Sequence, residues 1–141
     1  MATDPRLGTR IKAAQHALRV ALDAALRDRG LTMSQYAVLA ATGDEGAASN
    51  AELAARAGIT PQSAHEVVRV LEERGLLERP GALGRGRAGR IGLTRAGRRA
   101  LTGADARVRA VEARMVERLG DAQARRLGEL LAAATDALGD D

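Results

Sequence analysis

The sequence predicts a mainly α-helical fold with one small β-hairpin, in the order four helices, two strands and two helices. Three observations support this class. Helix caps and apolar residues spaced three or four apart recur along the chain. Two short strand candidates flank one glycine-rich segment, and the repeated strand–helix alternation of a parallel sheet is missing. At 141 residues, the chain is expected to form a single domain with its own core.

The composition predicts a globular protein whose core is built from small and aliphatic side chains. Hydrophobic residues make up 45% of the chain and charged residues 28%, and Tyr36 is the one aromatic residue. Alanine-rich cores bury little area per residue, so we expect dimerisation to add burial. The absence of cysteine excludes disulfides and thiolate metal sites. The chain has no apolar signal core and no apolar run of membrane-spanning length, which predicts a soluble, cytoplasmic protein without a membrane partner.

The first two predicted helices have clear start and stop signals. An apolar stripe predicts a helix over 6–29, which Gly30 ends. Thr32 and Gln35 have the spacing of a capping box, which predicts a second helix over about 33–42.

The next two helices are separated by a glycine. Ser49 precedes "NAELAARA" with a glutamate at the capping-box position, and Gly58 ends this short helix. Thr60 is then an N-cap with Pro61 at the first helical position, where its missing N–H costs nothing. This fourth helix is expected to run to about Arg74.

The second half of the chain starts with the strand candidates "LLER" and "GRIGLT". Thr94 is expected to cap a long helix that runs to about Leu119 and is weakened by Gly97 and Gly103. Asp121 is expected to cap a final helix. One face of that helix carries an apolar stripe made of Leu127, Leu130, Leu131, Ala134 and Leu138.

Residues 51–71, "AELAARAGITPQSAHEVVRVL", have the pattern of a helix-turn-helix. Such a motif needs a small residue where the helices cross and a turn residue that tolerates positive φ, and Ala54 and Gly58 fit these positions. Apolar residues that hold the second helix are predicted to be Ala64, Val67 and Leu71. The opposite face carries side chains that suit base edges and phosphates in a major groove, namely Gln62, Ser63, His65, Glu66 and Arg69. The alternative is an ordinary helix pair with a solvated outer face.

Two residues on this face leave more than one interpretation open. His65 is expected to bond a base or phosphate, or to be merely exposed. His16, the other histidine, is far away in sequence, so no metal site is predicted. Glu66 can accept from a cytosine amino group or pair with Arg69 one turn on. Gln62, Ser63 and Arg69 are therefore the stronger candidates.

Positive charge is concentrated in one segment. The chain has a formal net charge of +4, yet residues 79–99 contain seven arginines and no acidic residue. A local basic patch of this kind is typical of a nucleic-acid-binding face.

Within this segment, "RPGALGRGRAGRIGLT" admits three interpretations. Gly84, Gly86 and Gly89 formally match a dinucleotide-binding G-x-G-x-x-G, but that motif requires a βαβ context that the chain lacks. A disordered Gly/Arg linker is a second interpretation. The strand candidates on either side favour a third, a wing that directs its basic side chains at phosphates or into a narrow minor groove, namely Arg85, Arg87 and Arg90.

The chain resembles the MarR family of winged helix-turn-helix transcriptional regulators. The resemblance rests on "LTMSQYAVL", "AELAARAGITPQSAHEVVRVLEERGLLER" and "RIGLTRAGRRAL", which occur in the family's order. It implies a homodimer whose first and last helices intertwine and whose recognition helices read a pseudo-palindrome in double-stranded DNA. Family wings usually carry an Asp–x–Arg pair. "GRGRAGR" has no acidic residue, so which arginine enters the minor groove stays open.

We therefore expect residues 1–30 and 105–141 to dimerise and residues 31–104 to form the DNA-binding lobe. The expected DNA-binding residues are Ser49, Thr60, Pro61, Gln62, Ser63, His65, Glu66, Arg69, Arg85, Arg87 and Arg90. The resemblance also implies an effector pocket between the dimer helices and the lobe, for which the loose candidates are His16, Arg19 and Tyr36. Tyr36 as a core aromatic residue and His16 as an interface residue are the alternatives.

The expected function is a ligand-responsive dimeric repressor without a cofactor. The alternative is a non-specific architectural protein that binds nucleic acid through charge alone, with a steep salt dependence. Two distant histidines, no cysteine and no nucleophile motif leave no predicted catalytic residue, so an enzyme is not expected.

Overall fold

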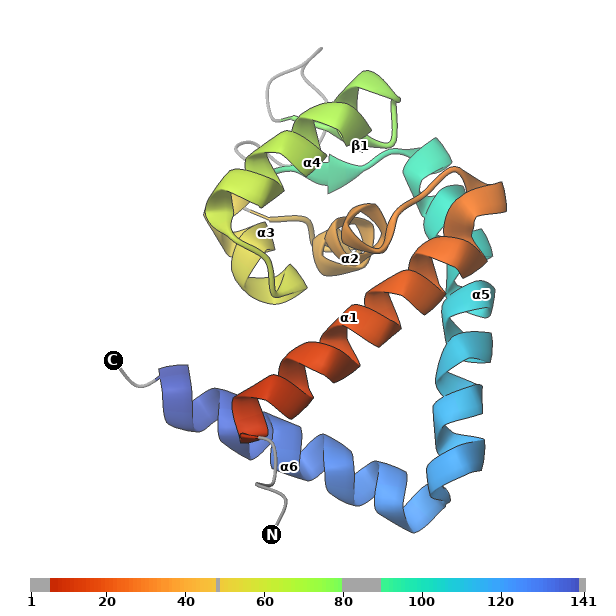
Figure 1. Ribbon diagram of the computed structural model, residues 1–141. Coiled ribbons are helices and arrows are strands. Elements are labelled where there is room, and N and C mark those ends of the chain that lie inside the picture. Colours follow the sequence, from red (N-terminus) through yellow and green to blue (C-terminus); the bar gives the residue numbers. More distant parts are fainter. Residues whose placement is uncertain (1–5, 48, 80–89, 140–141) are drawn as a thin grey trace, which may run out of the picture.

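The computed structural model describes residues 6–47, 49–79 and 90–139. The elements follow the predicted order, with one additional short 3₁₀ helix (Figure 1). In chain order they are α1 (Leu7–Leu26), the 3₁₀ helix η1 (Arg27–Arg29), α2 (Met33–Thr42), α3 (Asn50–Ala57), α4 (Pro61–Glu73), β1 (Leu77–Glu78), β2 (Gly92–Leu93), α5 (Arg95–Leu119) and α6 (Asp121–Gly139). The predicted fold class is confirmed.

The helix boundaries follow the capping signals closely. Thr32 and Gln35 form a full capping box at the start of α2. The side chain of Thr60 accepts from the backbone N–H of Ser63, and Thr94 caps α5 in the same way. Each such cap contributes about 1 kcal/mol, so several helix starts are set by local hydrogen bonds.

Two boundary predictions need correction. Asp121 is the first residue of α6 and not its cap, because Gly120 precedes the helix and its carbonyl already accepts from the N–H of Ala124 at 2.9 Å. The first helix ends at Leu26, and the last predicted turn is the tighter η1, which the left-handed Gly30 (φ 68°) ends.

The hairpin is shorter than the sequence suggested. β1 and β2 pair antiparallel over only two residues each, with Leu77 opposite Leu93 and Glu78 opposite Gly92. A third segment joins them, because Ala47 and Ile91 exchange two backbone hydrogen bonds of 2.9 and 2.7 Å. The loop before α3 is therefore tied to the base of the hairpin.

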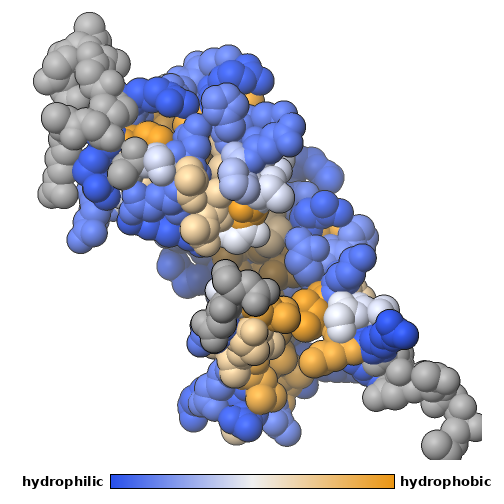
Figure 2. Space-filling model, turned by 90° about the vertical axis from the view of Figure 1, so that its left-hand side faces the viewer, coloured by the Kyte–Doolittle hydropathy of each residue, from blue (hydrophilic) through white to orange (hydrophobic). Residues whose placement is uncertain are grey.

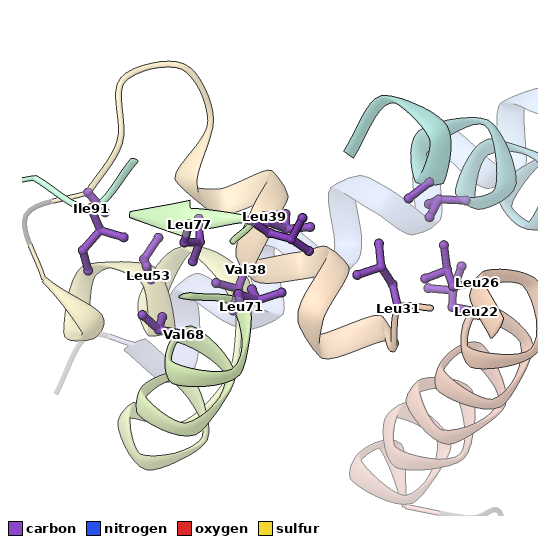
Figure 3. Packing of buried hydrophobic residues seen from close by; sticks show 14 of the residues in the cluster. Leu22, Leu26, Leu31, Val38, Leu39, Leu53, Val68, Leu71, Leu77 and Ile91 are labelled. Atoms are coloured by element: carbon purple, nitrogen blue, oxygen red, sulfur yellow. The ribbon is translucent and has the colours of Figure 1, made fainter. Parts of the chain in front are cut away.

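The core lies where α2, α4, α5 and the hairpin meet. Leu39, Leu53 and Leu71 are fully buried, and Figure 3 shows them beside Leu77 and Ile91 of the hairpin region. Leu22, Leu26 and Leu31 extend the same cluster to the junction of α1 and α2 (Figure 3). Because one continuous core spans both ends, the recognition elements are rigidly joined to the helices below them.

One prediction about the inner face of α4 is only partly right. Ala64 and Leu71 are fully buried as expected, but Val68 fills the position between them, and Val67 is half-buried. A step of four followed by three keeps Ala64, Val68 and Leu71 on one stripe, whereas Val67 lies at the edge of it.

Gly97 was predicted to weaken α5. The structure shows that it also has a packing role. A Cβ built on it would lie 2.0 Å from the carbonyl oxygen of Leu76. The start of α5 therefore packs directly on the backbone that enters the hairpin, and Thr94 adds a hydrogen bond of 2.6 Å from its hydroxyl to the Gly75 carbonyl. Only glycine permits this approach.

The helices α1, α5 and α6 lie on one side of the lobe formed by α2, α3, α4 and the hairpin (Figure 1). α1 and α5 are in contact beside the lobe and diverge away from it, and α6 returns from the far end of α5. None of the described helices is long and apolar enough to cross a membrane.

Apolar side chains remain uncovered on these three helices. Figure 2 shows hydrophobic surface gathered at the lower end of the molecule, where α1 and α6 lie. No described residue of α6 is buried. The exposed large hydrophobic residues of the three helices are Leu7, Ile11, Val20, Met115, Val116, Leu119, Leu127, Leu130, Leu131 and Leu138.

Candidate DNA-binding interface

The turn between α3 and α4 has the geometry of a helix-turn-helix. Gly58 adopts the left-handed conformation (φ 70°), and the N–H of Ile59 donates to the carbonyl of Ala54 at 3.1 Å. Ala54 is buried where the two helices cross. Thr60 then caps α4 with Pro61 at its first turn. These features fix the direction in which α4 leaves the turn.

The outer face of α4 is open to solvent. All five predicted contact residues on it are exposed, namely Gln62, Ser63, His65, Glu66 and Arg69. The hydroxyl of Thr60 donates to that of Ser63 at 2.9 Å, so the helix start presents two hydroxyls together. This is an arrangement suited to phosphate, while the longer side chains one turn on can reach base edges.

Arg69 has a different ion-pair partner from the one suggested by the sequence. Its Nη1 lies 2.9 Å from Oε1 of Glu73, one turn further along α4. Glu66 is therefore not its partner in this structure. Both members of the pair are more than half exposed, so the pair contributes only a few tenths of a kcal/mol and releases Arg69 easily.

The structure adds one residue that sequence reasoning missed. Nδ2 of Asn50, the first residue of α3, lies 3.0 Å from Nδ1 of His65 on the outer face of α4. Ser49 caps α3 immediately before it, through a hydrogen bond from the N–H of Glu52. The start of α3 therefore lies beside the middle of the candidate recognition face.

The wing is described only at its base. Arg85 and Arg87 lie outside the described residues. Arg90 is described, and its guanidinium donates to the carbonyls of Glu45 and Gly46, both at 3.0 Å. Arg56 of α3 donates to the same Gly46 carbonyl at 3.0 Å. In this structure Arg90 therefore braces the loop before α3 and does not extend outward.

Other arginines of the basic segment are exposed around this base. Arg95, Arg98 and Arg99 are exposed at the start of α5. Arg98 has a loose contact of 3.3 Å with Asp44, whose side chain is almost fully exposed. Arg79 pairs with Glu72 at 2.6 Å. The described part of the segment thus places positive charge around the base of the hairpin.

The three effector candidates do not form one site. Arg19 lies 3.2 Å from Nδ1 of His16, and both are exposed on α1. Tyr36 instead donates its hydroxyl to Asp105 at 2.6 Å, between α2 and α5. Burial, this hydrogen bond and the negative charge of Asp105 raise the pKa of Tyr36 above its ordinary range.

His16 also lines an open groove of about 740 Å³ along α1. Arg114 of α5 closes one side of it, and the remaining lining is apolar, with Val20 and several alanines. A cationic edge beside an apolar floor is a suitable surface for an organic acid. Within the described ranges, no cluster of three or more His, Asp or Glu side chains is placed to hold a metal ion.

A helix-turn-helix with an exposed polar second helix, a two-stranded hairpin beside it and a basic flank define a winged helix-turn-helix DNA-binding protein. A model of the MarR family matches residues 29–88. The chain is 36% identical over 131 residues to the HTH-type transcriptional repressor Rv2887 of Mycobacterium tuberculosis, a match that covers 93% of this chain and 94% of the relative. The chain belongs to the MarR family and is a DNA-binding transcriptional regulator, not an enzyme.

Solved structures agree with this assignment. The M. tuberculosis MarR family protein Rv2887 in complex with salicylic acid has a TM-score of 0.75 and 35% identity, covering 95% of this chain and 99% of that one. The same protein in complex with DNA has a TM-score of 0.70 and 32% identity, covering 97% and 100%. CouR from Rhodococcus jostii RHA1 bound to p-coumaroyl-CoA has a TM-score of 0.77 and 29% identity, covering 91% and 90%.

Proposed function

We propose that the chain acts as a homodimeric repressor that binds a pseudo-palindromic operator, with one α4 in the major groove of each half-site. The observation that carries this proposal is the outer face of α4, where Gln62, Ser63, His65, Glu66 and Arg69 are all exposed while the inner stripe is buried. Two α4 helices held by a symmetric dimer would read half-sites about one helical turn, roughly 34–36 Å, apart.

Within this interface we assign different tasks to different residues. Gln62, His65 and Arg69 are placed to read base edges, with Glu66 as a further candidate. Ser49, Thr60 and Ser63 are at helix starts, where phosphate oxygens would be favoured, and Pro61 packs beside them. The wing arginines Arg85 and Arg87 would contact the backbone or the minor groove. Arg90 would act by bracing the base of the wing.

The division of the chain into two parts also belongs to this proposal. Residues 31–104 would form the DNA-binding lobe, and residues 1–30 and 105–141 would form the dimer. The support is that α6 buries none of its described residues within one chain, while its leucines and those of α1 form an apolar surface. Such a surface is covered when two copies associate. Because the partner is chromosomal DNA, we place the protein in the cytoplasm.

We further propose that an aromatic carboxylic acid relieves repression. Rv2887 binds salicylic acid, and CouR binds p-coumaroyl-CoA. In this chain His16 and Arg114 line the α1 groove and provide donor or positive groups there, and Arg19 lies 3.2 Å from His16. An acid bound there would lower DNA affinity only if it binds one arrangement of the dimer more tightly than the other.

Fluorescence anisotropy tests the proposal directly. The full-length protein is titrated against the intergenic duplex beside its own gene and against a scrambled duplex, at about 0.15 M salt, where non-specific binding is weak. We expect a preference of about a thousandfold, and a loss of binding when salicylate is added. Equal weak binding to both duplexes, with a steep salt dependence, would instead support the architectural alternative.

A further inference from the structure

His65 of α4 is contacted by a side chain from another helix, α3. Nδ2 of Asn50 lies 3.0 Å from its Nδ1, across the angle between α3 and α4. Asn50 is half-buried, whereas the imidazole is exposed. A partly buried amide at the start of one helix therefore orients a solvent-facing ring on the next.

The chemistry of the two groups determines which nitrogen of the ring carries the proton. An amide nitrogen can only donate, so the ring nitrogen that faces it must accept. A neutral imidazole has one acceptor and one donor nitrogen. If Nδ1 accepts from Asn50, the proton is on Nε2, and that N–H points away from Asn50.

The surroundings of the Asn50 amide oxygen support the orientation in which Nδ2 faces His65. Oδ1 of Asn50 is buried and has no hydrogen-bond partner within the described part of the chain. If the amide were turned over, its NH₂ group would occupy that buried position with two hydrogen atoms to satisfy. One unpaired acceptor costs less than two unpaired donors.

We propose that Asn50 is a positioning residue for base recognition. It fixes His65 in the tautomer that is protonated at Nε2, so that α4 presents a hydrogen-bond donor at this position. A donor is matched best by guanine, which offers two acceptors in the major groove, N7 and O6, whereas adenine and thymine each offer one and cytosine presents only its amino donor. The inference rests on the proposed function, because it places the outer face of α4 in the major groove.

The position of His65 fits this task. It lies in the second turn of α4, after the cap at Thr60 and the hydroxyl of Ser63. Residues in the N-terminal half of a recognition helix are the ones that reach base edges. A contact that only held α3 against α4 would not require Nε2, on the far side of the His65 ring, to carry a proton.

The first arm of the test examines the tautomer without DNA. Long-range ¹H–¹⁵N NMR on the full-length protein at pH 8.5 distinguishes a protonated from an unprotonated ring nitrogen. The chain has two histidines, and His16→Gln assigns the signals. We expect His65 to be protonated at Nε2. Asn50→Asp, whose carboxylate only accepts, is expected to move the proton to Nδ1. The helix dipole favours an acidic residue at the start of α3, and circular dichroism checks that this variant keeps its fold.

The second arm examines base preference. Duplexes are selected from a randomised library by the wild-type protein, and the variants are then tested on them at the same pH. His65→Ala and Asn50→Asp are expected to lose the guanine preference at the same base pair, with about a tenfold loss of affinity for the selected duplex. The double variant is expected to behave like His65→Ala alone. Gln62→Ala serves as the control and is expected to affect a different base pair.

Several results would overturn the inference. A proton on Nδ1 of His65 in the wild-type protein contradicts the tautomer. A uniform loss of affinity by Asn50→Asp on all duplexes, or an unchanged guanine preference, shows a structural contact only and leaves the proposed function intact. If the wild-type protein selects no sequence at all, the proposed function fails and the inference fails with it, whatever the NMR arm shows.

Discussion

The hydroxyl of Tyr36 donates a 2.6 Å hydrogen bond to Oδ1 of Asp105, 69 residues further along the chain. It joins α2 of the lobe to the middle of α5, and both side chains are half-buried. A separate ion pair joins Arg107 of α5 to Asp28 of η1 at 2.6 Å. The lobe is therefore attached to α5 by a directed polar bond as well as by the shared core.

Removal of this hydroxyl should weaken the attachment. Tyr36→Phe leaves a half-buried carboxylate without its donor, so we expect the free energy of unfolding to fall by about 1–2 kcal/mol. Denaturant unfolding at matched protomer concentration measures the loss. Asp105→Asn retains an oxygen acceptor and is the control, with a smaller expected loss. Equal stability of wild type and Tyr36→Phe would show that the bond contributes nothing.

The ionisation of Tyr36 should depend on folding. Burial is the main cause of its raised pKa, and the hydrogen bond to Asp105 and the charges of Asp105 and Glu112 act in the same direction, while Arg109 opposes them. The fold thus favours the neutral phenol over the unfolded chain, whose pKa is about 10. This stabilisation is complete below the unfolded pKa and is lost as the pH rises through the folded pKa.

Phenolate absorbance measures this directly, because the chain has one tyrosine and no tryptophan. In the native protein we expect phenolate to appear only together with alkaline unfolding, which circular dichroism follows in parallel. In denaturant the same signal should appear near pH 10. A native protein that titrates like the denatured chain would contradict the raised pKa.

Substitution of the two glycines in the first half of α5 should have opposite effects. A Cβ at Gly97 meets the Leu76 backbone at 2.0 Å, so Gly97→Ala must displace the hairpin or α5 and is expected to cost about 2 kcal/mol or more. The atoms nearest to a Cβ at Gly103 belong to the guanidinium of Arg29, the closest at 3.0 Å, and this flexible side chain can move. Gly103→Ala is expected to be neutral or to stabilise by up to about 1 kcal/mol. Thermal unfolding at one protomer concentration compares the two, and similar melting temperatures would refute the assignment.

Local chemistry explains why so much of the fold was predictable. Caps such as Thr32, Thr60 and Thr94 act within one turn, so their sequence spacing is enough to place a helix start. The exposed face of α4 follows from helical periodicity for the same reason. Val68, and not Val67, is the fully buried valine. Which of the two is buried depends on the angle at which α4 crosses its neighbours, and periodicity alone does not fix that angle.

Three contacts that were missed join segments far apart in the sequence. Asn50 and His65 are 15 residues apart and meet only because of the angle between α3 and α4. Arg90 is bonded to the Glu45 carbonyl because Ala47 pairs with Ile91, a bridge that no strand pattern indicated. Gly97 looked unfavourable because a helix interior disfavours glycine, while its benefit lies in a backbone that approaches from outside the helix.

Loss of a phosphate-contacting arginine and loss of a base-reading side chain should affect DNA binding in different ways. Arg87→Ala is expected to weaken binding to all duplexes alike and to lower the slope of log affinity against log salt by about one. Gln62→Ala is expected to lose about 1–3 kcal/mol on the operator and to leave scrambled DNA almost unaffected. Anisotropy titrations at several salt concentrations measure both. If both variants lose the same affinity on both duplexes, Gln62 does not read a base.

Recognition by a pair of α4 helices requires the dimer, so disruption of the dimer should remove operator binding without any change in the lobe. Leu131 is 45% exposed in one chain and lines an apolar groove with Ile11 of α1 and Met115 of α5. Leu131→Asp would bury an unpaired carboxylate there, a cost of several kcal/mol. We expect light scattering to show a monomer at micromolar concentration and operator affinity to fall by more than about a hundredfold.

Ala132→Asp is the matched control for this prediction, since it adds the same charge on the exposed face of α6 away from the leucines. It should remain dimeric and bind the operator like the wild type. Circular dichroism should show that both variants retain their helices, because the core of the lobe does not include α6. A Leu131→Asp protein that stays dimeric, or a monomer with full operator affinity, would contradict the requirement for two linked recognition helices.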